Sequence, residues 1–264
     1  MLKIENIKKV FNPGTINEKI ALNGLSIHLE EGDFVTIIGG NGAGKSTLMN
    51  AVSGVFSIDS GKIEIDGKDV SKDAEYKRAK YIGRVFQDPM MGTAAGMGIE
   101  ENLALALRRG KKRSLKWGIF NQEREKYRDA LENFDLGLEN RLTSKVGLLS
   151  GGQRQALTLL MATITKPKLL LLDEHTAALD PKTAEKVLHL SKTIVEKNNL
   201  TTMMITHNMK DAIEYGNRLI MLNNGEIIID IRDEEKQNLT VEYLMKKFQE
   251  VSGSTFDDDR ALLG

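Results

Sequence analysis

A glycine-rich stretch near the N-terminus has the residue types and spacing of a loop that binds nucleotide phosphates. It directly follows the apolar run at 34–38 and fits the pattern G-x-x-x-x-G-K-[ST] from Gly39 onward. Glycines let successive backbone N–H groups turn toward an anion, while the Lys45 ammonium neutralises the outer phosphates and the Ser46 hydroxyl can ligate Mg²⁺. We therefore expect a nucleoside triphosphate to be bound by Gly39, Asn41, Gly42, Ala43, Gly44, Lys45, Ser46 and Thr47.

Two adjacent carboxylates follow a second apolar run, at 169–172. Asp173, at the end of this expected strand, is placed to bind Mg²⁺ or its water. Glu174 comes next, projects the other way, and can polarise an attacking water. Taken alone, such a pair can equally be a solvated acidic turn after a core strand. With a phosphate loop upstream, it predicts nucleotide hydrolysis.

The sequence LSGGQ at 149–153 supplies a third motif. With the phosphate loop and the strand-end acids, it closely resembles the ATP-binding subunits of ABC transporters, whose signature motif it reproduces unbroken. The resemblance extends over about residues 1–250 and implies that two subunits pair head to tail, as a homodimer or with a homologous ATPase subunit. Ser150 as a plain helix N-cap is compatible with this role. The resemblance implies that the partner's ATP is bound by Ser150, Gly151, Gly152 and Gln153.

Three further positions match the family individually. Phe11, in a short stretch before the second expected strand, resembles the aromatic residue that stacks on adenine, although Phe stands where Tyr is more familiar. It could also be a plain edge-strand hydrophobe. Gln87 directly follows the expected strand at 81–86. It matches the family's glutamine that reaches Mg²⁺ and the attacking water. His207 follows the run at 202–205 and resembles the switch histidine of the γ-phosphate, although a lone strand-end His is more often structural.

The remaining family features complete the predicted site. The segment at 178–180 resembles the D-loop that crosses to the partner subunit, and His175 stands where many relatives have Pro after the catalytic acid. Gly40, in the phosphate loop, is a second departure from the family pattern. Neither departure removes a chemical group that hydrolysis needs. The resemblance thus implies Mg²⁺-dependent ATP hydrolysis. Its catalytic residues are Glu174, His207 and Gln87, and its metal ligands are Ser46, Gln87 and Asp173.

The elements that must position these residues are readable from periodicity. The apolar runs at 34–38, 169–172 and 202–205 are typical of strands buried on both faces, and helical patterns between them predict a parallel sheet covered by helices. Ligands of such sheets lie beyond the carboxyl ends of the strands, where the phosphate loop, the acids and His207 all fall. The main helices expected are 45–53, 100–109, 122–134, 153–165 and 183–197.

The expected fold class is α/β, with a P-loop NTPase (RecA-like) core and a mainly parallel sheet. Alternating strands at 2–7, 21–29 and 62–65 predict an N-terminal antiparallel β subdomain. A charged helical stretch predicts an inserted α-helical subdomain at about 88–165, within an ATPase domain at 1–250. The end of the chain reads as a hairpin turning at Asn224-Gly225, a last helix and a flexible tail at 251–264. One face of that helix is marked by Val241, Leu244, Met245 and Phe248.

Composition limits the function classes. The 264 residues carry 37 basic and 37 acidic side chains, so no global field attracts nucleic acid or an anionic membrane. Without cysteine there is no disulfide framework, thiolate metal site or Cys nucleophile. No apolar run approaches the roughly 20 residues of a membrane span, and no signal peptide is expected. The family resemblance then implies a peripheral protein at the cytoplasmic face of the membrane, partnered by separate transmembrane permease subunits and an extracytoplasmic substrate-binding protein.

Two surface features and the substrate remain as hypotheses. Met90, Met91 and the glycine-rich stretch at 92–98 could receive a short helix of the permease or could be a flexible loop with buried methionines. The basic run at 108–116, before Trp117, could contact lipid headgroups but is more typical of a solvated loop. The residues at 173–181 and 206–218 resemble those of ATPase subunits of bacterial amino-acid importers, among them a group linked to tryptophan and tyrosine. The alternatives are an ABC exporter and an ABC ATPase acting on nucleic acid.

Overall fold

The computed structural model describes residues 1–111, 118–132, 134 and 136–252. Most of the basic run, Trp117 and the predicted tail beyond residue 252 lie outside the described residues. Within the described ranges, no helix combines the length and the apolar character that crossing a membrane requires.

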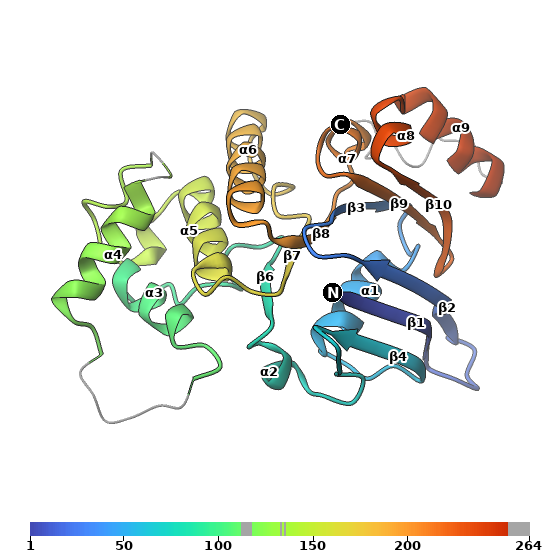
Figure 1. Cartoon of the computed structure of the whole chain (residues 1–264), viewed down its shortest axis with the longest axis horizontal. Coiled ribbons are helices and arrows are strands. Elements are labelled where there is room, and N and C mark those ends of the chain that lie inside the picture. Colours follow the sequence, from blue (N-terminus) through green and yellow to red (C-terminus); the bar gives the residue numbers. More distant parts are fainter. Residues whose placement is uncertain (112–117, 133, 135, 253–264) are drawn as a thin grey trace. The chain divides into compact units, whose positions relative to one another are not determined.

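The chain divides into two compact units, whose elements are coloured along the sequence in Figure 1. The first unit joins Met1–Arg78 to the chain from Asn199 onward, and the second is Ala79–Asn198. The helical subdomain predicted at 88–165 lies within the second unit, which also contains two strands and a long helix.

An antiparallel sheet forms the N-terminal part of the first unit. Its strand order is β2-β1-β4-β5, and every neighbouring pair is antiparallel, as predicted. Burial alternates over the last five residues of β2, from Leu25 to Leu29, because successive side chains of a strand point to opposite faces. The strands are β1 (Leu2–Phe11), β2 (Lys19–Leu29), β4 (Ser60–Ile65) and β5 (Lys68–Asp69).

The second group of strands in this unit is built around β3, which is buried along its whole length. It pairs in parallel with β8 and with β9, and β9 continues into the antiparallel hairpin with β10. The predicted turn is confirmed, because Asn224 and Gly225 have φ values of 46° and 76°, the left-handed pair that a tight hairpin needs. These strands are β3 (Phe34–Gly39), β8 (Thr201–Ile205), β9 (Arg218–Asn223) and β10 (Glu226–Arg232).

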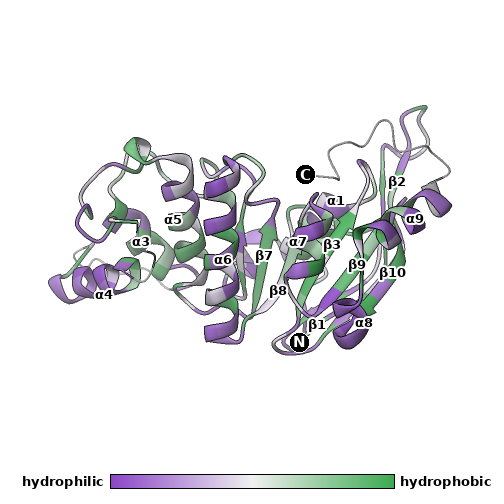
Figure 2. Cartoon of the chain, turned by 90° about the horizontal axis from the view of Figure 1, so that it is seen from above, coloured by the Kyte–Doolittle hydropathy of each residue, from purple (hydrophilic) through white to green (hydrophobic). Residues whose placement is uncertain are grey.

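The helices of the first unit complete its core. The predicted face of the last helix is confirmed, because Leu244 and Phe248 are buried in a cluster with Ile38 and Met221, and Val241 and Met245 pack against its rim. Figure 2 shows the apolar ribbon of β3 and β9 beside these helices. The helices are α1 (Lys45–Ser53), α2 (Glu75–Arg78), α7 (Met209–Glu214), α8 (Asp233–Gln237) and α9 (Val241–Ser252).

The second unit combines a parallel strand pair, β6 and β7, with a helical cluster. Leu103, Leu131 and Leu157, from three different helices, share one buried core. The α4 helix is drawn mostly hydrophilic in Figure 2, and only Tyr127 and Leu131 of its residues are buried. The elements are β6 (Ile82–Val85), α3 (Ile99–Leu107), α4 (Asn121–Glu132), a 3₁₀ turn (Val146–Leu148), α5 (Gly151–Thr163), β7 (Leu169–Asp173) and α6 (Pro181–Asn198).

Helices α5 and α6 approach each other closely at one glycine. A Cβ atom on Gly152 would lie 2.2 Å from Cγ2 of Thr183, whereas one on Gly151 would meet only the end of the flexible Leu179 side chain, at 3.3 Å. The second glycine of the signature is therefore required by helix packing, independently of any ligand.

A buried arginine closes the C-terminal end of α1, the helix that follows the phosphate loop. Nη1 of Arg78 donates to the carbonyl oxygens of Ala51 (2.7 Å) and Val52 (2.9 Å), and Nε donates to that of Asp73 (2.8 Å). Carbonyls in the last turn of a helix have no partner within the helix, and a cation there also complements the helix dipole. Arg78 therefore stabilises the helix from which Lys45 projects.

Replacing this arginine should destabilise the protein. Arg78→Met leaves buried carbonyls without donors, so we expect a loss of about 2–4 kcal/mol in the free energy of unfolding. Urea unfolding followed by circular dichroism measures it. Lys77→Met is the matched control, because its exposed ammonium makes only a 3.8 Å pair with Asp73 and should cost under about 1 kcal/mol. Equal small losses in both variants would show that Arg78 caps nothing.

The glycine contact predicts a compensating pair of substitutions. Gly152→Ala should lower the free energy of unfolding by about 1–3 kcal/mol through overpacking, and Thr183→Ser, which removes the clashing methyl group, should restore most of it. Gly151→Ala is the control and should cost less, since Leu179 can move. If Gly152→Ala is harmless, or if the double variant is no better than the single one, the close packing is not a constraint.

Candidate functional site

The predicted phosphate loop lies between β3 and α1, and its backbone is pressed against two neighbouring strands. Gly39 has φ 152°, and a Cβ there would lie 2.3 Å from the carbonyl oxygen of Leu222. Gly44 has φ 104°, and a Cβ there would lie 2.6 Å from the carbonyl oxygen of Ala21. Only glycine combines these left-handed conformations with such close approach.

Lys45 is the first residue of α1, and its side chain is buried under the loop, with 5% exposed. Its Nζ donates to the carbonyl oxygens of Gly39 (2.6 Å) and Gly40 (3.2 Å). No side chain caps the N-terminus of α1, so its first amides and dipole are directed to the loop. Ammonium and amides together make the loop a site for an anion.

His207 is held at the same edge as the phosphate loop. It follows β8, the parallel neighbour of β3, and the Thr206 amide donates to the carbonyl oxygen of Ile37 (3.2 Å). On its other side, Asn208 caps α7 through the amides of Lys210 and Asp211. The carboxyl ends of two adjacent strands thus bring the predicted histidine and the loop together.

Phe11 is the last residue of β1 rather than part of a stretch between the strands, because β1 continues further than its apolar alternation indicated. Its ring meets that of Phe56 edge to face, with centroids 5.5 Å apart. The Lys9 ammonium lies 5.7 Å and 5.6 Å from the two centroids and pairs with Asp59 at 2.8 Å. Phe56 was missed by sequence reasoning, because nothing local connects it to Phe11.

The second unit gathers three predicted residues at the ends of β6 and β7. Asp173 ends β7, Glu174 follows it, and Gln87 lies just beyond β6, the parallel partner of β7. Nη2 of Arg84 pairs with Oδ2 of Asp173 at 2.8 Å, an ion pair in which both side chains are largely buried. Sequence reasoning also missed Arg84, although its alternation with Val85 along β6 could have indicated a side chain near the strand-end acid.

The backbone at Glu174 leaves the strand in a left-handed conformation, with φ 46°. Such a conformation is uncommon for a residue with a side chain and tends to persist where the surroundings hold it. The next residue, His175, restrains this backbone. It is buried, and its Nε2 lies 2.9 Å from Oγ of Ser191 on α6. Because Ser191 donates its own proton to the carbonyl of Val187 (2.8 Å), His175 is the donor in this bond. Burial lowers the pKa of His175 to about 4, so the imidazole is neutral.

The signature residues form a complete capping box at the start of α5. Oγ of Ser150 accepts from the Gln153 amide (3.3 Å), and Oε1 of Gln153 accepts from the Ser150 amide (3.2 Å). Nε2 of Gln153 also donates to the carbonyl of Leu136 (3.3 Å). Because Ser150 is the cap, α5 begins at Gly151, two residues earlier than predicted.

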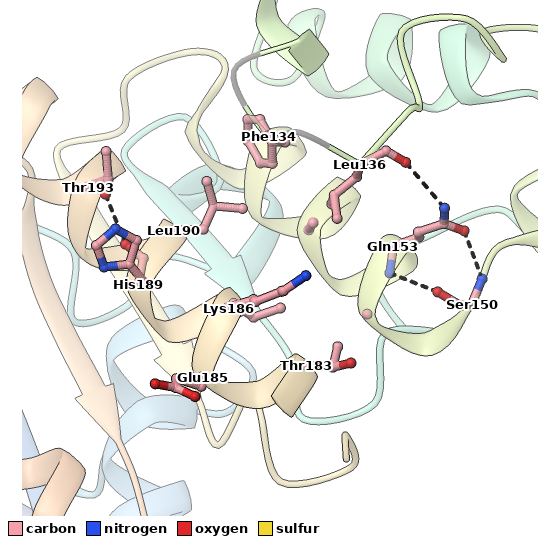
Figure 3. Close-up of a pocket in the computed structure, with 13 residues that line it drawn as sticks. Phe134, Leu136, Ser150, Gln153, Thr183, Glu185, Lys186, His189, Leu190 and Thr193 are labelled. Carbon is pink, nitrogen blue, oxygen red and sulfur yellow. Dashed lines mark hydrogen bonds between the residues drawn. The ribbon is translucent and has the colours of Figure 1, made fainter. Parts of the chain in front are cut away.

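A pocket of about 660 Å³ lies beside this capped turn, between α5 and α6 (Figure 3). Lys186 of α6 extends across it toward Gln153. The pocket therefore presents polar groups from both helices: the capped turn on one side and a cation on the other. It is lined by Phe134, Leu136, Ser150, Gly152, Gln153, Ala156, Thr183, Glu185, Lys186, Val187, His189, Leu190 and Thr193.

The predicted site residues are thus distributed over both units. The first unit brings together the phosphate loop and His207, with Phe11 at the end of the neighbouring antiparallel sheet. The second unit brings together Gln87, Asp173 and Glu174, and separately presents the capped signature turn.

Comparisons with known proteins agree with this set of motifs. A model of the ABC transporter family matches residues 22–177, more than half of the chain. The tyrosine transport ATP-binding protein of Clostridioides difficile is 49% identical over 254 residues, which is 94% of this chain and 99% of that protein. The methionine import ATP-binding protein MetN of Bartonella henselae is 35% identical over 232 residues, 86% of this chain and 64% of that protein.

A solved structure gives the same fold. The dimeric post-hydrolysis state of the ATP-binding cassette MJ0796, bound to ADP and Pi, matches with a TM-score of 0.75 and 30% identity, over 88% of this chain and 98% of that one. The predicted α/β P-loop NTPase fold, with parallel strands and a helical subdomain, is confirmed. The chain belongs to the ATP-binding cassette family of ABC transporters and is an ATPase subunit of that family.

Proposed function

We propose that this chain powers the import of an aromatic amino acid such as tyrosine, as one of two ATPase subunits docked on separate permease subunits. The observation that carries the substrate class is the 49% identity to a tyrosine transport ATP-binding protein, because the match covers 99% of that protein. The complex acts at the membrane, with the ATPase pair on the cytoplasmic face and a substrate-binding protein on the other.

Pairing of two subunits is supported by the two kinds of anion-binding helix end in one chain. The N-terminus of α1 follows the phosphate loop, and the N-terminus of α5 carries the signature turn. In a head-to-tail pair, one ATP would contact the loop of one subunit and Ser150 to Gly152 of the other. Its γ-phosphate would join the subunits, and hydrolysis would release them. The structure of MJ0796 is described as dimeric.

Mg²⁺ fits the chemistry of the predicted donors. Ser46 offers a hydroxyl, Asp173 a carboxylate and Gln87 an amide carbonyl, and hard oxygen ligands are what Mg²⁺ prefers. No cluster of three or more His, Cys, Asp or Glu side chains in the described ranges could hold a metal ion. Mg²⁺ is usually bound through one or two protein carboxylates plus substrate phosphates. The ion would neutralise phosphate charge during hydrolysis.

Glu174 is proposed as the general base. It lies directly after Asp173 at the end of β7, and its left-handed backbone turns the chain out of the strand at that residue. A carboxylate so placed can accept a proton from an attacking water, while His207, Gln87 and the phosphate loop orient the reactants.

Docking on the permease is proposed at Met90 and Met91. Their side chains are 53% and 70% exposed, so they are not the buried methionines of the alternative reading. Arg154 of α5 donates from Nη1 to Sδ of Met90, which connects this surface to the helix that begins at the signature. Flexible, polarisable methionines suit a surface that receives a short helix.

Removing the general base tests the catalytic assignment. Glu174→Gln should lower ATP turnover by ~10²–10⁴-fold without weakening ATP binding, because only proton acceptance is lost. Phosphate release and calorimetric titration measure the two effects, and uptake of labelled tyrosine by cells carrying the transporter should fall in parallel. Glu196→Gln, the same change at an exposed position of α6, should leave all three unchanged. Full hydrolysis by Glu174→Gln would refute the assignment, and uptake competed by methionine but not by tyrosine would refute the substrate class.

The docking surface is tested by a charge at Met91. Met91→Glu should retain the ATPase activity of the isolated chain but reduce its co-purification with permease subunits from membranes at least about tenfold, because a buried unpaired carboxylate opposes an apolar interface. Leu105→Glu is the control, since Leu105 is also an exposed apolar residue of the second unit. Undiminished recovery of the permease with Met91→Glu would place docking elsewhere.

A further inference from the structure

A second lysine reaches the phosphate loop from outside. Lys19 is the first residue of β2, and its side chain extends over Gly42, where a Cβ atom would lie 3.1 Å from the lysine Nζ and 4.0 Å from its Cε. Gly42 has φ 78° and is exposed, so this contact is on the solvent side of the loop. The loop therefore has one ammonium beneath it, that of Lys45, and another on its outer surface.

The strand register connects this lysine to the predicted adenine site. Lys19 is directly opposite Phe11 in the antiparallel pair of β1 and β2. Cross-strand partners lie about 5 Å apart, so one rung of the sheet carries both the aromatic side chain and the cation that reaches the loop. A nucleotide whose base stacks on Phe11 and whose phosphates lie in the loop must pass this rung.

The charges around Lys19 leave its ammonium available to a ligand. The preceding residue, Glu18, uses Oε2 to accept from the Gly14 amide at 2.6 Å. Within the described ranges, no carboxylate forms an ion pair with Lys19. Lys45, in contrast, is buried and bonded to carbonyls of its own loop. Two ammonium groups beside one short loop repel each other, and a polyphosphate bound between them removes that repulsion.

We propose that Lys19 is a further nucleotide-binding residue, whose ammonium binds the polyphosphate of ATP and ADP at the outer side of the phosphate loop. The inference rests on the proposed binding of nucleotide by that loop. Lys19 contacts the loop and takes no part in proton transfer, so it contributes to binding equally before and during hydrolysis. Such uniform binding lowers KM and leaves kcat unchanged.

The test compares three variants by calorimetric titration with MgADP, which reports binding without turnover. Lys19→Met should weaken ADP binding about 3- to 10-fold, the size expected for one solvent-accessible charge contact. Lys19→Arg should restore most of the affinity. Lys8→Met is the matched control, because it removes an exposed ammonium from the same hairpin, at a position that lies against Gly24. It should bind as the wild type does.

Two further measurements separate binding from other roles. Added NaCl should weaken ADP binding less steeply in Lys19→Met than in the wild type, because one fewer charge contact is screened. In steady-state hydrolysis, Lys19→Met should raise KM by the same 3- to 10-fold range and leave kcat within about twofold. Affinity equal to the wild type, an equal loss in Lys8→Met, or a fall in kcat at unchanged KM would overturn the proposal. If the phosphate loop does not bind nucleotide, Lys45→Met would bind ADP as well as the wild type does. That result distinguishes failure of the proposed function from failure of the Lys19 proposal.

Discussion

The close approach of the phosphate loop to its neighbouring strands is the constraint on which the site depends. The carbonyls of Leu222 and Ala21 lie where side chains of Gly39 and Gly44 would have to be. The loop can occupy this space only as bare backbone, and in that conformation α1 begins directly at Lys45. Arg78 holds the other end of the same helix through its last carbonyls. The position of the ammonium and of the helix dipole thus follows from contacts at both ends of a nine-residue helix.

Residues that define the family motifs also have structural roles in this chain. Ser150 and Gln153 cap α5 reciprocally, and Gly152 permits α5 to pack on Thr183 of α6. The positions proposed to contact nucleotide therefore also carry a structural requirement.

The segment around Glu174, the proposed general base, is held by contacts from two different elements. Arg84 on β6 pairs with Asp173, and His175 is bonded to Ser191 on α6. Between these two fixed neighbours, Glu174 adopts a left-handed backbone conformation that an unsupported turn would seldom keep. His175 replaces the proline expected from the resemblance, and its hydrogen bond to α6 restrains the loop by a side-chain contact instead of by a fixed φ angle.

The sequence by itself determined the features that depend on neighbours along the chain. The phosphate loop, the capping box of α5, the buried strand runs and the Asn224-Gly225 turn each depend on residues within a few positions of one another, and all of them were predictable. The helix and strand bounds shifted by one or two residues in most cases, because capping decides where a helix begins, as Ser150 does for α5. The apolar face of α9 was predictable from its spacing alone.

Only the tertiary structure decided which side chains support the site. Arg84 and Asp173 are 89 residues apart, Phe11 and Phe56 come from different elements, and Lys19 reaches Gly42 because β2 lies beside the loop. These contacts depend on which strands are neighbours and in what register they pair. A shift of one residue along β2 would turn Lys19 to the opposite face of the sheet. Local periodicity predicts that a strand exists but carries no information about its partner, and for that reason these residues were found only in the folded chain.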